Sequence, residues 1–291
     1  MDWRRTTARR QLIKPGISCA AAASALLGFV MHAPDGNHGR MLVTWGAVLL
    51  LAAGGATFNN LQDRFQDAEF ARTRHRPLPG ARITVPESVT QAIVLTGLSL
   101  IGLFCLQGGF FLPAIGLAAL GLYNGIYTPL KTRTTAAIVP GAVCGMIPPL
   151  IGWVAAGGRP GAHQIWHLMV IFGVWQLPHY WLLMLTYRED YRKAAATSMV
   201  NRFSTAQFNR IVFAWIPPYS FLMVLLPAFG MLRTTWITWL VLANAFCLPL
   251  LFAILLFSPA AKIRYGFLFR SINLSIGMLA VLLALDRIMT V

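Results

Sequence analysis

The chain has 291 residues, of which 57% are hydrophobic and only 11% are charged, and its formal net charge is +15. A soluble globular domain carries about 25% charged residues, so this composition excludes that class and indicates a polytopic membrane protein. Basic loops on one face of a membrane protein account for the excess of Lys and Arg, and no nucleic-acid partner is expected.

Nine apolar segments are each long enough to cross the hydrocarbon core, which takes about 20 helical residues. They are continuous apolar runs, not the alternating segments typical of a membrane barrel, so helices are expected. The segments cover about 12–32, 41–60, 89–107, 109–127, 135–156, 163–185, 211–230, 236–257 and 267–285. The sequence therefore predicts an all-α fold. A single transmembrane domain covers 12–285, with a basic N-terminus at 1–11 and a C-terminal tail at 286–291.

Lys and Arg divide unevenly between the two sides of these segments. Twenty lie on the side that holds the N-terminus and four on the other. The positive-inside rule places the N-terminus and the loops at about 61–88, 128–134, 186–210 and 258–266 in the cytoplasm. The expected location is a bacterial cytoplasmic (inner) membrane. A mitochondrial inner membrane is the less favoured alternative, because the N-terminus is short.

The four cysteines fall in four separate apolar segments, and none has the spacing of a metal ligand. They are therefore expected to be small core residues. They are Cys19, Cys105, Cys144 and Cys247.

The first large cytoplasmic loop opens with the stretch TFNNLQDRFQDAEFARTRHRPLPG, which holds three of the nine acidic residues. Asn59, Asp63 and Asp67 are spaced i, i+4, i+8, so on a helix they form one stripe about 12 Å long. Carboxylates placed this closely repel one another unless a cation lies between them. Mg²⁺ prefers such oxygen ligands, completed by water and phosphate. The alternative is a solvated helix end, with Asp63 paired to Arg64 or Asp67 to Arg72.

Basic residues accompany the acidic stripe. Arg72, Arg74 and Arg76 follow it in the chain, and arginines beside a magnesium site are suited to hold phosphate oxygens bidentately. In the next loop on the same side, YNGIYTPLKTR places Tyr127 and Lys131 at i, i+4. The alternative there is a lysine that extends to the membrane surface beside an interfacial tyrosine.

These motifs resemble those of the UbiA-type intramembrane prenyltransferases, in which NxxxDxxxD precedes an arginine run and RPL, and YxxxK follows the fourth helix. Three further stretches resemble the heme o synthase branch of that family. The resemblance runs from about residue 12 to 200 and continues beyond as hydropathy alone. The three stretches are KPGI at 14–17, MIPPLIGWVAAGG at 146–158 and WQLPHYWLLMLTYREDYRKAAATSMV at 175–200.

The resemblance implies a bundle of nine transmembrane helices around a central, laterally open cavity with a cytoplasmic cap. It also implies an enzyme that transfers a farnesyl group from farnesyl diphosphate to a vinyl group of heme b, giving heme o and diphosphate. Mg²⁺ would be held by Asn59, Asp63 and Asp67. The catalytic residues would be Asp63, Asp67 and Lys131, and the diphosphate would contact Arg72, Arg76, Lys131 and Arg188.

The sequence departs from the wider family in the loop after the sixth segment. A second DxxxD motif is usual there, whereas this chain has YREDY, with Tyr187 and Tyr191 at the expected aspartate positions. Asp190 is the best remaining candidate for a further metal ligand. The altered motif fits the heme branch.

His179 and Trp175 are candidate heme contacts in the sixth segment. An ionisable residue inside a span is costly and is often functional. His179 could ligate the heme iron, contact a propionate or shape the cavity through a hydrogen bond. The alternative is a neutral histidine that satisfies the carbonyl freed by Pro178.

Competing functions are a polyprenyltransferase acting on a quinone or chlorophyll precursor, a transporter or channel, and a heme-binding scaffold without catalysis. The missing DxxxD and the WQxPH sequence count against the first, and the placement of the acids at one surface counts against the second. The expected partners are farnesyl diphosphate, heme b and membrane lipid. A heme a synthase or a terminal oxidase assembly is a possible further partner.

Overall fold

The computed structural model describes residues 3–189, 203–258 and 264–290, and every regular element in these ranges is helical. A π-helix, Gly121–Tyr127, and a short 3₁₀ helix, Thr135–Ala137, interrupt the α-helices. The α-helices are α1 (Trp3–Leu12), α2 (Pro15–His32), α3 (His38–Glu69), α4 (Val85–Phe104), α5 (Phe111–Leu120), α6 (Thr128–Leu130), α7 (Ile138–Ala155), α8 (His163–Thr186), α11 (Thr205–Ala214), α12 (Ile216–Val224), α13 (Thr235–Phe257) and α14 (Tyr265–Met289).

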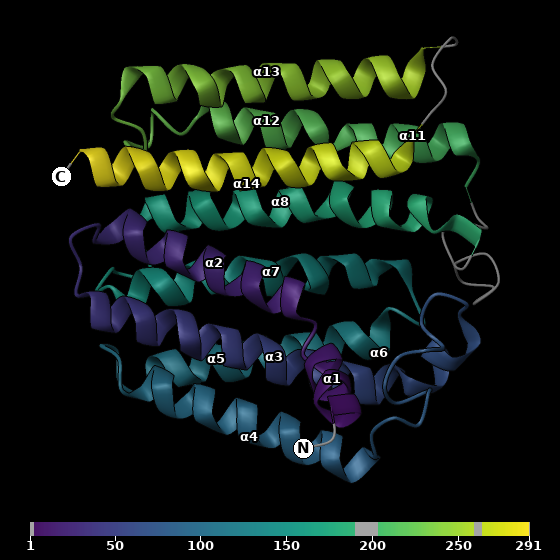
Figure 1. Cartoon of the computed structure of the whole chain (residues 1–291). Coiled ribbons are helices and arrows are strands. Elements are labelled where there is room, and N and C mark those ends of the chain that lie inside the picture. The colour runs from purple at the N-terminus through teal and green to yellow at the C-terminus, as the bar shows by residue number, and fades with distance from the viewer. Residues whose placement is uncertain (1–2, 190–202, 259–263, 291) are drawn as a thin grey trace.

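The long helices lie side by side in successive layers (Figure 1). From α13 at one edge, the layers pass through α11 and α12, α14 and α8, and then reach α2 and α7. Helices α3 and α5 follow, and α4 forms the opposite edge. Helix α2 contacts α3, α7 and α14, so it joins the two halves of the bundle.

Eight helical segments in the described ranges are long and apolar enough to cross a membrane, which makes the chain a multi-pass membrane protein. The segment expected at 211–230 is not among the eight. It includes only the end of α11 and all of α12, two shorter helices that meet at Trp215. Pro217 and Pro218 follow after Ile216, and a proline lacks the N–H that would continue α11. Figure 1 shows α11 and α12 end to end beside α13.

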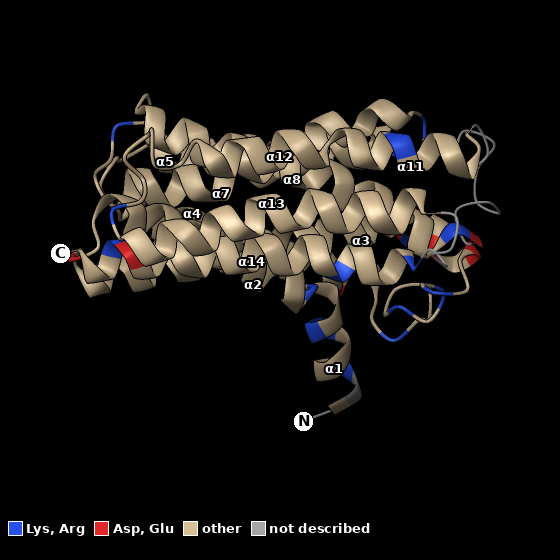
Figure 2. Ribbon diagram, turned by 90° about the horizontal axis from the view of Figure 1, so that it is seen from above, with Lys and Arg blue, Asp and Glu red and all other residues tan. Residues whose placement is uncertain are grey.

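Charged residues gather at the two ends of the helices, and the middle of the bundle is almost free of them (Figure 2). Helix α3 brings acidic residues to one of these ends. With 32 residues at 1.5 Å each it is about 48 Å long, well beyond the thickness of the hydrocarbon core. Its last turns therefore carry the segment after Asn59 to or beyond the membrane surface as a helix.

The expectation that the cysteines are core residues is wrong for three of them. Cys19, Cys105 and Cys247 are exposed on the bundle, and Cys144 is half-buried. In a membrane, apolar side chains on the outer surface contact lipid, so an apolar segment does not distinguish inward from outward positions.

Helices α2 and α7 approach each other closely at two glycines. A Cβ on Gly152 would lie 1.7 Å from the carbonyl oxygen of Ala25, and one on Gly28 would lie 2.0 Å from that of Pro149. Small residues allow this backbone contact between membrane helices. The contact fixes α2, and with it the N-terminal segment that reaches the candidate site.

We predict that Gly152→Ala lowers the stability of the protein, because the added methyl group forces α2 and α7 apart. The expected loss is about 1–3 kcal/mol, measured as a lower thermal unfolding midpoint in detergent. Gly97→Ala is the matched control, since a Cβ there has no neighbour within 4 Å. Equal midpoints for Gly152→Ala and the wild type would contradict this account of the packing.

Candidate active site

The acidic stripe lies on the last turns of α3. Asn59, Asp63 and Asp67 are all inside this helix, so their spacing places them on one side of it. All three are buried, with exposed fractions of 2%, 8% and 5%. Burial of two carboxylates is unfavourable unless each has a charged or hydrogen-bonding partner.

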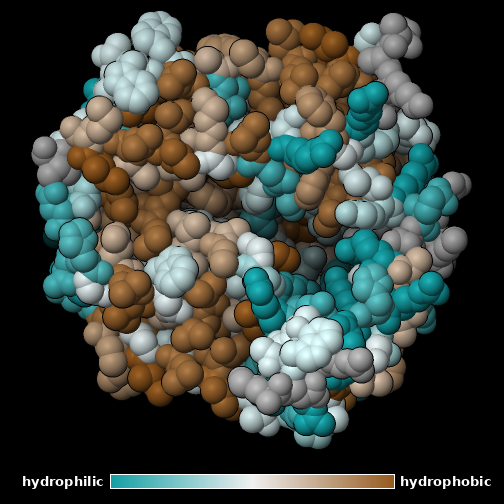
Figure 3. Space-filling view, viewed as in Figure 1, coloured by the Kyte–Doolittle hydropathy of each residue, from teal (hydrophilic) through white to brown (hydrophobic). Residues whose placement is uncertain are grey.

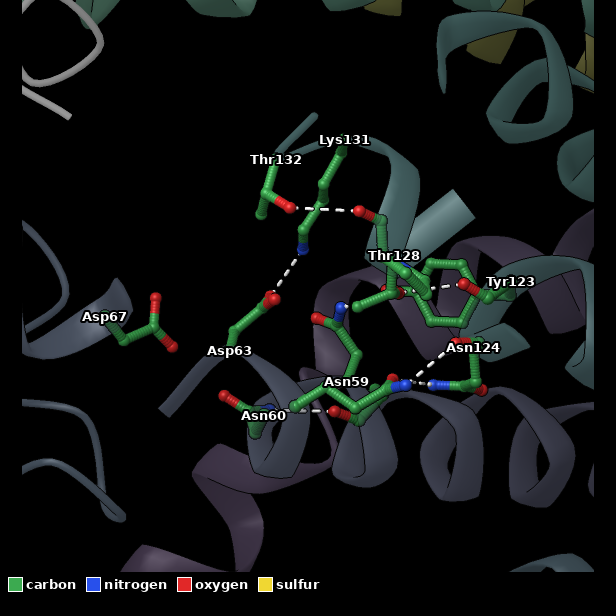
Figure 4. A network of polar contacts seen from close by, with 12 residues as sticks. Asn59, Asn60, Asp63, Asp67, Tyr123, Asn124, Thr128, Lys131 and Thr132 are labelled. Carbon is green, nitrogen blue, oxygen red and sulfur yellow. Dashed lines mark hydrogen bonds and ion pairs between the residues drawn. The ribbon is translucent and has the colours of Figure 1, made fainter. Parts of the chain in front are cut away.

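Each buried carboxylate is paired with a cation from a different loop. Lys131 Nζ lies 2.5 Å from Asp63 Oδ2, a pair that Figure 4 shows beside Asp67. Arg76 Nη1 donates to both oxygens of Asp67, at 2.9 and 2.8 Å. The neighbouring Arg64 instead donates to the carbonyl of Leu61. Two loops are therefore drawn onto the end of α3 by charge.

The amide of Asn59 is oriented by contacts on both sides. Its Nδ2 donates to Thr128 Oγ1 at 3.0 Å, and this hydroxyl donates to the carbonyl of Tyr123 at 2.8 Å. Its Oδ1 accepts a hydrogen bond from Lys14 Nζ. The amide oxygen consequently faces the same charged region as the two carboxylates.

Lys14 is the third cation of this region and directly precedes α2. Burial lowers the pKa of Lys14 to about 7, and repulsion from Arg76 and Lys131 acts in the same direction. Asp63 and Asp67 oppose this shift but do not cancel it. Arg76 and Lys131 balance the two carboxylates, and Lys14 is a further basic group whose protonated form a bound anion would favour.

The π-helix Gly121–Tyr127 is fastened to α3 next to the stripe. Asn124 Nδ2 donates to the carbonyl of Gly55 at 3.0 Å and to Gln62 Oε1 at 3.1 Å. Gln62 Nε2 donates in return to the carbonyl of Asn124 at 2.8 Å. π-Helical turns are rare and occur often at functional sites. Here the turn leads directly into the segment that delivers Lys131.

A cavity of about 200 Å³ opens beside the stripe, between the N-terminal segment and the loop after α3. Its lining includes Lys14, Arg72, Arg76 and His75, together with Asn60. This lining is rich in hydrogen-bond donors and positive charge. Such a cavity can hold a phosphate-bearing group.

The residue directly after α8, Tyr187, contacts the loop that follows α3. The guanidinium of Arg72 lies 4.8 Å from the ring centre of Tyr187. Arg188 donates to Thr205 Oγ1 at 3.1 Å, toward α11; it makes no ion pair with Asp63 or Asp67 in the part of the chain that the structure describes. Asp190 lies outside the described residues. The structure thus pairs Arg76 and Lys131 with the stripe and places Arg72 in the lining of the adjoining cavity, while Arg188 bonds Thr205.

Trp175 and His179 are held against α14. Trp175 Nε1 donates to the carbonyl of Ile272 at 3.0 Å, and His179 Nδ1 lies 2.8 Å from Asn273 Oδ1. The imidazole therefore bonds a side chain of another helix, rather than the carbonyl freed by Pro178.

Several polar residues that shape these regions were not predicted from the sequence. Asn124 and Asn273 lie within apolar segments, where an amide side chain needs a hydrogen-bond partner. Their positions in the sequence could therefore have predicted hydrogen bonds between helices. The contacts of Thr128 and Lys14 could not be predicted in this way, because both residues lie at segment ends, where polar side chains are common.

The donors on α3 fit a hard divalent cation that retains water or phosphate ligands. The described residues contain no group of three or more His, Cys, Asp or Glu side chains able to hold a metal ion. One amide oxygen and two carboxylates are too few to enclose a metal. Mg²⁺ is commonly bound by one or two carboxylates and completed by substrate phosphate.

Comparison with known proteins identifies related chains. Residues 21–273 match the UbiA prenyltransferase family. A protoheme IX farnesyltransferase of Geobacter sulfurreducens is 34% identical over 82% of this chain and 87% of its own. One of Oleidesulfovibrio alaskensis is 31% identical over 97% of both chains.

Solved structures show the same fold at lower identity. A structure described for digeranylgeranylglyceryl phosphate synthase superposes with a TM-score of 0.79 at 14% identity, covering 98% of this chain and 99% of the other. A UbiA homologue from Archaeoglobus fulgidus, bound to DMAPP and Mg²⁺, gives 0.70 at 15% identity, covering 97% and 99%. The resemblance seen in the motifs is confirmed, and the chain belongs to the UbiA prenyltransferase family.

Proposed function

We propose that this chain transfers a farnesyl group from farnesyl diphosphate to a vinyl group of heme b, giving heme o and diphosphate. The observation that carries the proposal is the pairing of Asp63 with Lys131 and of Asp67 with Arg76. This pairing occurs in a chain whose curated relatives are named protoheme IX farnesyltransferase. Delivery of heme o to a heme a synthase or a terminal oxidase assembly remains a prediction.

Asn59, Asp63 and Asp67 would hold Mg²⁺. When bound, the metal would supply positive charge against the diphosphate that leaves the allylic carbon. The buried, oxygen-rich stripe supports this role. Asp190 remains a candidate for a further ligand.

The cations around the stripe would bind the diphosphate. Lys131 and Arg76 would exchange a carboxylate partner for phosphate oxygens, while Arg72 and Lys14 already line the basic cavity. Fixed positive groups of this kind stabilise charge that develops on a leaving group and need little reorganisation. Arg188 could take part through its other N–H groups, because only Nη1 is bonded to Thr205.

The proposed membrane arrangement has nine spans, with α11 and α12 together forming a broken seventh one. The N-terminus and the acidic end of α3 face the cytoplasm of a bacterial inner membrane. A central cavity, open toward lipid, would receive the farnesyl chain and keep water from the allylic cation. Figure 3 supports such an opening, because the face is hollowed near its middle with hydrophilic side chains gathered on one side.

Expression in a bacterial membrane that lacks heme o tests the function. We expect extracted pigments to contain hydroxyethylfarnesyl heme with the wild type. Asp63→Asn should reduce its rate of formation roughly 10²–10³-fold, the range found when an electrostatic catalytic group is removed. Glu69→Gln, an exposed position on the same helix, is the control and should retain activity. Absence of heme o with the well-expressed wild-type protein would refute the proposal.

We further predict that Lys131→Met changes metal and diphosphate binding in opposite directions. Without diphosphate, the variant should bind Mn²⁺ more tightly, because Asp63 no longer has a competing cation. Its affinity for farnesyl diphosphate should fall roughly tenfold or more, the value of one charge-assisted contact. Electron paramagnetic resonance of free Mn²⁺ and calorimetry measure the two affinities.

Arg133→Met is the matched control for Lys131→Met, because Arg133 is exposed in the same loop. It should leave both affinities unchanged. Parallel losses of Mn²⁺ and diphosphate binding in Lys131→Met would show that Lys131 supports the site only structurally.

A further inference from the structure

His179 occupies a well-defined position between α8 and α14. Its ring centre lies 4.7 Å from that of Trp175 and 4.8 Å from that of Phe269, both in tilted arrangements. Trp175 is itself fixed to α14 by its bond to the carbonyl of Ile272. The imidazole thus has aromatic neighbours on both helices that limit its rotation.

A chain of two hydrogen bonds sets the tautomer of this imidazole. Asn273 Nδ2 donates to the carbonyl of Phe269 at 2.7 Å, which fixes the orientation of the amide and turns Oδ1 toward His179. An amide oxygen only accepts hydrogen bonds. His179 Nδ1 must therefore carry the proton, and Nε2 carries the lone pair.

The lone pair on Nε2 is available. In the described ranges of the chain Nε2 has no hydrogen-bond partner. It is also not a fully buried atom. The side chain is half-buried, and Nε2 is at least partly accessible. A neutral imidazole whose Nδ1–H is held by a fixed acceptor is the usual form of a histidine that ligates iron or another metal.

We propose that Asn273 is a positioning residue that holds His179 in the Nδ1–H form, so that Nε2 can ligate the iron of the heme substrate. The inference rests on the proposed function, since it takes heme b as the substrate. It assigns a role to Asn273 that lies outside the acidic stripe and its cations. Ligation at this point would also fix where the porphyrin sits against α8 and α14.

Titration of the purified full-length protein with protoheme tests the assignment. The wild type should give an iron–histidine stretching band in the resonance Raman spectrum of the ferrous complex, and His179→Ala should lose it. Asn273→Leu keeps the size of the side chain but removes the acceptor. It should weaken heme affinity roughly tenfold to hundredfold, as loss of an outer hydrogen-bond partner does, and weaken or broaden the band.

Asn273→Asp is the conservative variant that restores an acceptor. It should recover heme binding and shift the band to higher frequency, because a carboxylate makes the imidazole more basic. Asn244→Leu is the matched control, since Asn244 donates from α13 to the carbonyl of Ser275 on α14 and its hydrogen bonds in the described residues do not involve His179. It should leave the band unchanged.

Two outcomes would overturn the inference: a wild-type complex without a histidine-ligated spectrum, or an Asn273→Leu variant with the wild-type band and affinity. These outcomes are distinct from failure of the proposed function, which is judged by whether the wild type forms heme o. A wild type that forms heme o with a spectrum insensitive to Asn273 would refute only the role of Asn273.

Discussion

The arrangement of the candidate site depends on the burial of two carboxylates at the end of α3. Asp63 and Asp67 are almost inaccessible, and an uncompensated charge in such a place costs several kcal/mol. Lys131 and Arg76 meet this requirement from positions 68 and 9 residues away in the chain. The loops after α3 and α6 are therefore placed by the same charges that form the candidate chemistry.

This compensation also explains how one set of residues could serve two states. Without substrate, the cations neutralise the carboxylates. With a metal and a diphosphate, the same cations would face phosphate oxygens and the carboxylates would face the metal. Lys14 is the third basic side chain of the region; burial is the main cause of its lowered pKa, and repulsion from Arg76 and Lys131 adds to the shift. An incoming anion would relieve that repulsion, and this favours diphosphate over a neutral ligand.

Much of the architecture could be predicted from hydropathy and spacing, because burial in lipid and helical periodicity are properties of neighbouring residues. Eight of the expected spans and the stripe of Asn59, Asp63 and Asp67 follow from such local patterns. The partners of the charges could not be obtained this way, since the choice of Arg76 over Arg72 for Asp67 depends on how the loop folds back. The hydrogen bond between Asn273 and His179 is equally nonlocal. The exposed cysteines show that an apolar segment does not by itself reveal which of its residues face the core.

The central claim is that the cations exchange partners when substrate binds. A structure of the protein with farnesyl diphosphate and Mg²⁺ measures this directly, through the distance between Lys131 Nζ and Asp63 Oδ2, which is 2.5 Å here. The account predicts that this contact opens, that Asp63 and Asp67 face the metal, and that Lys131 and Arg76 contact phosphate oxygens. A complex in which both ion pairs remain intact, with the diphosphate bound elsewhere, would contradict it.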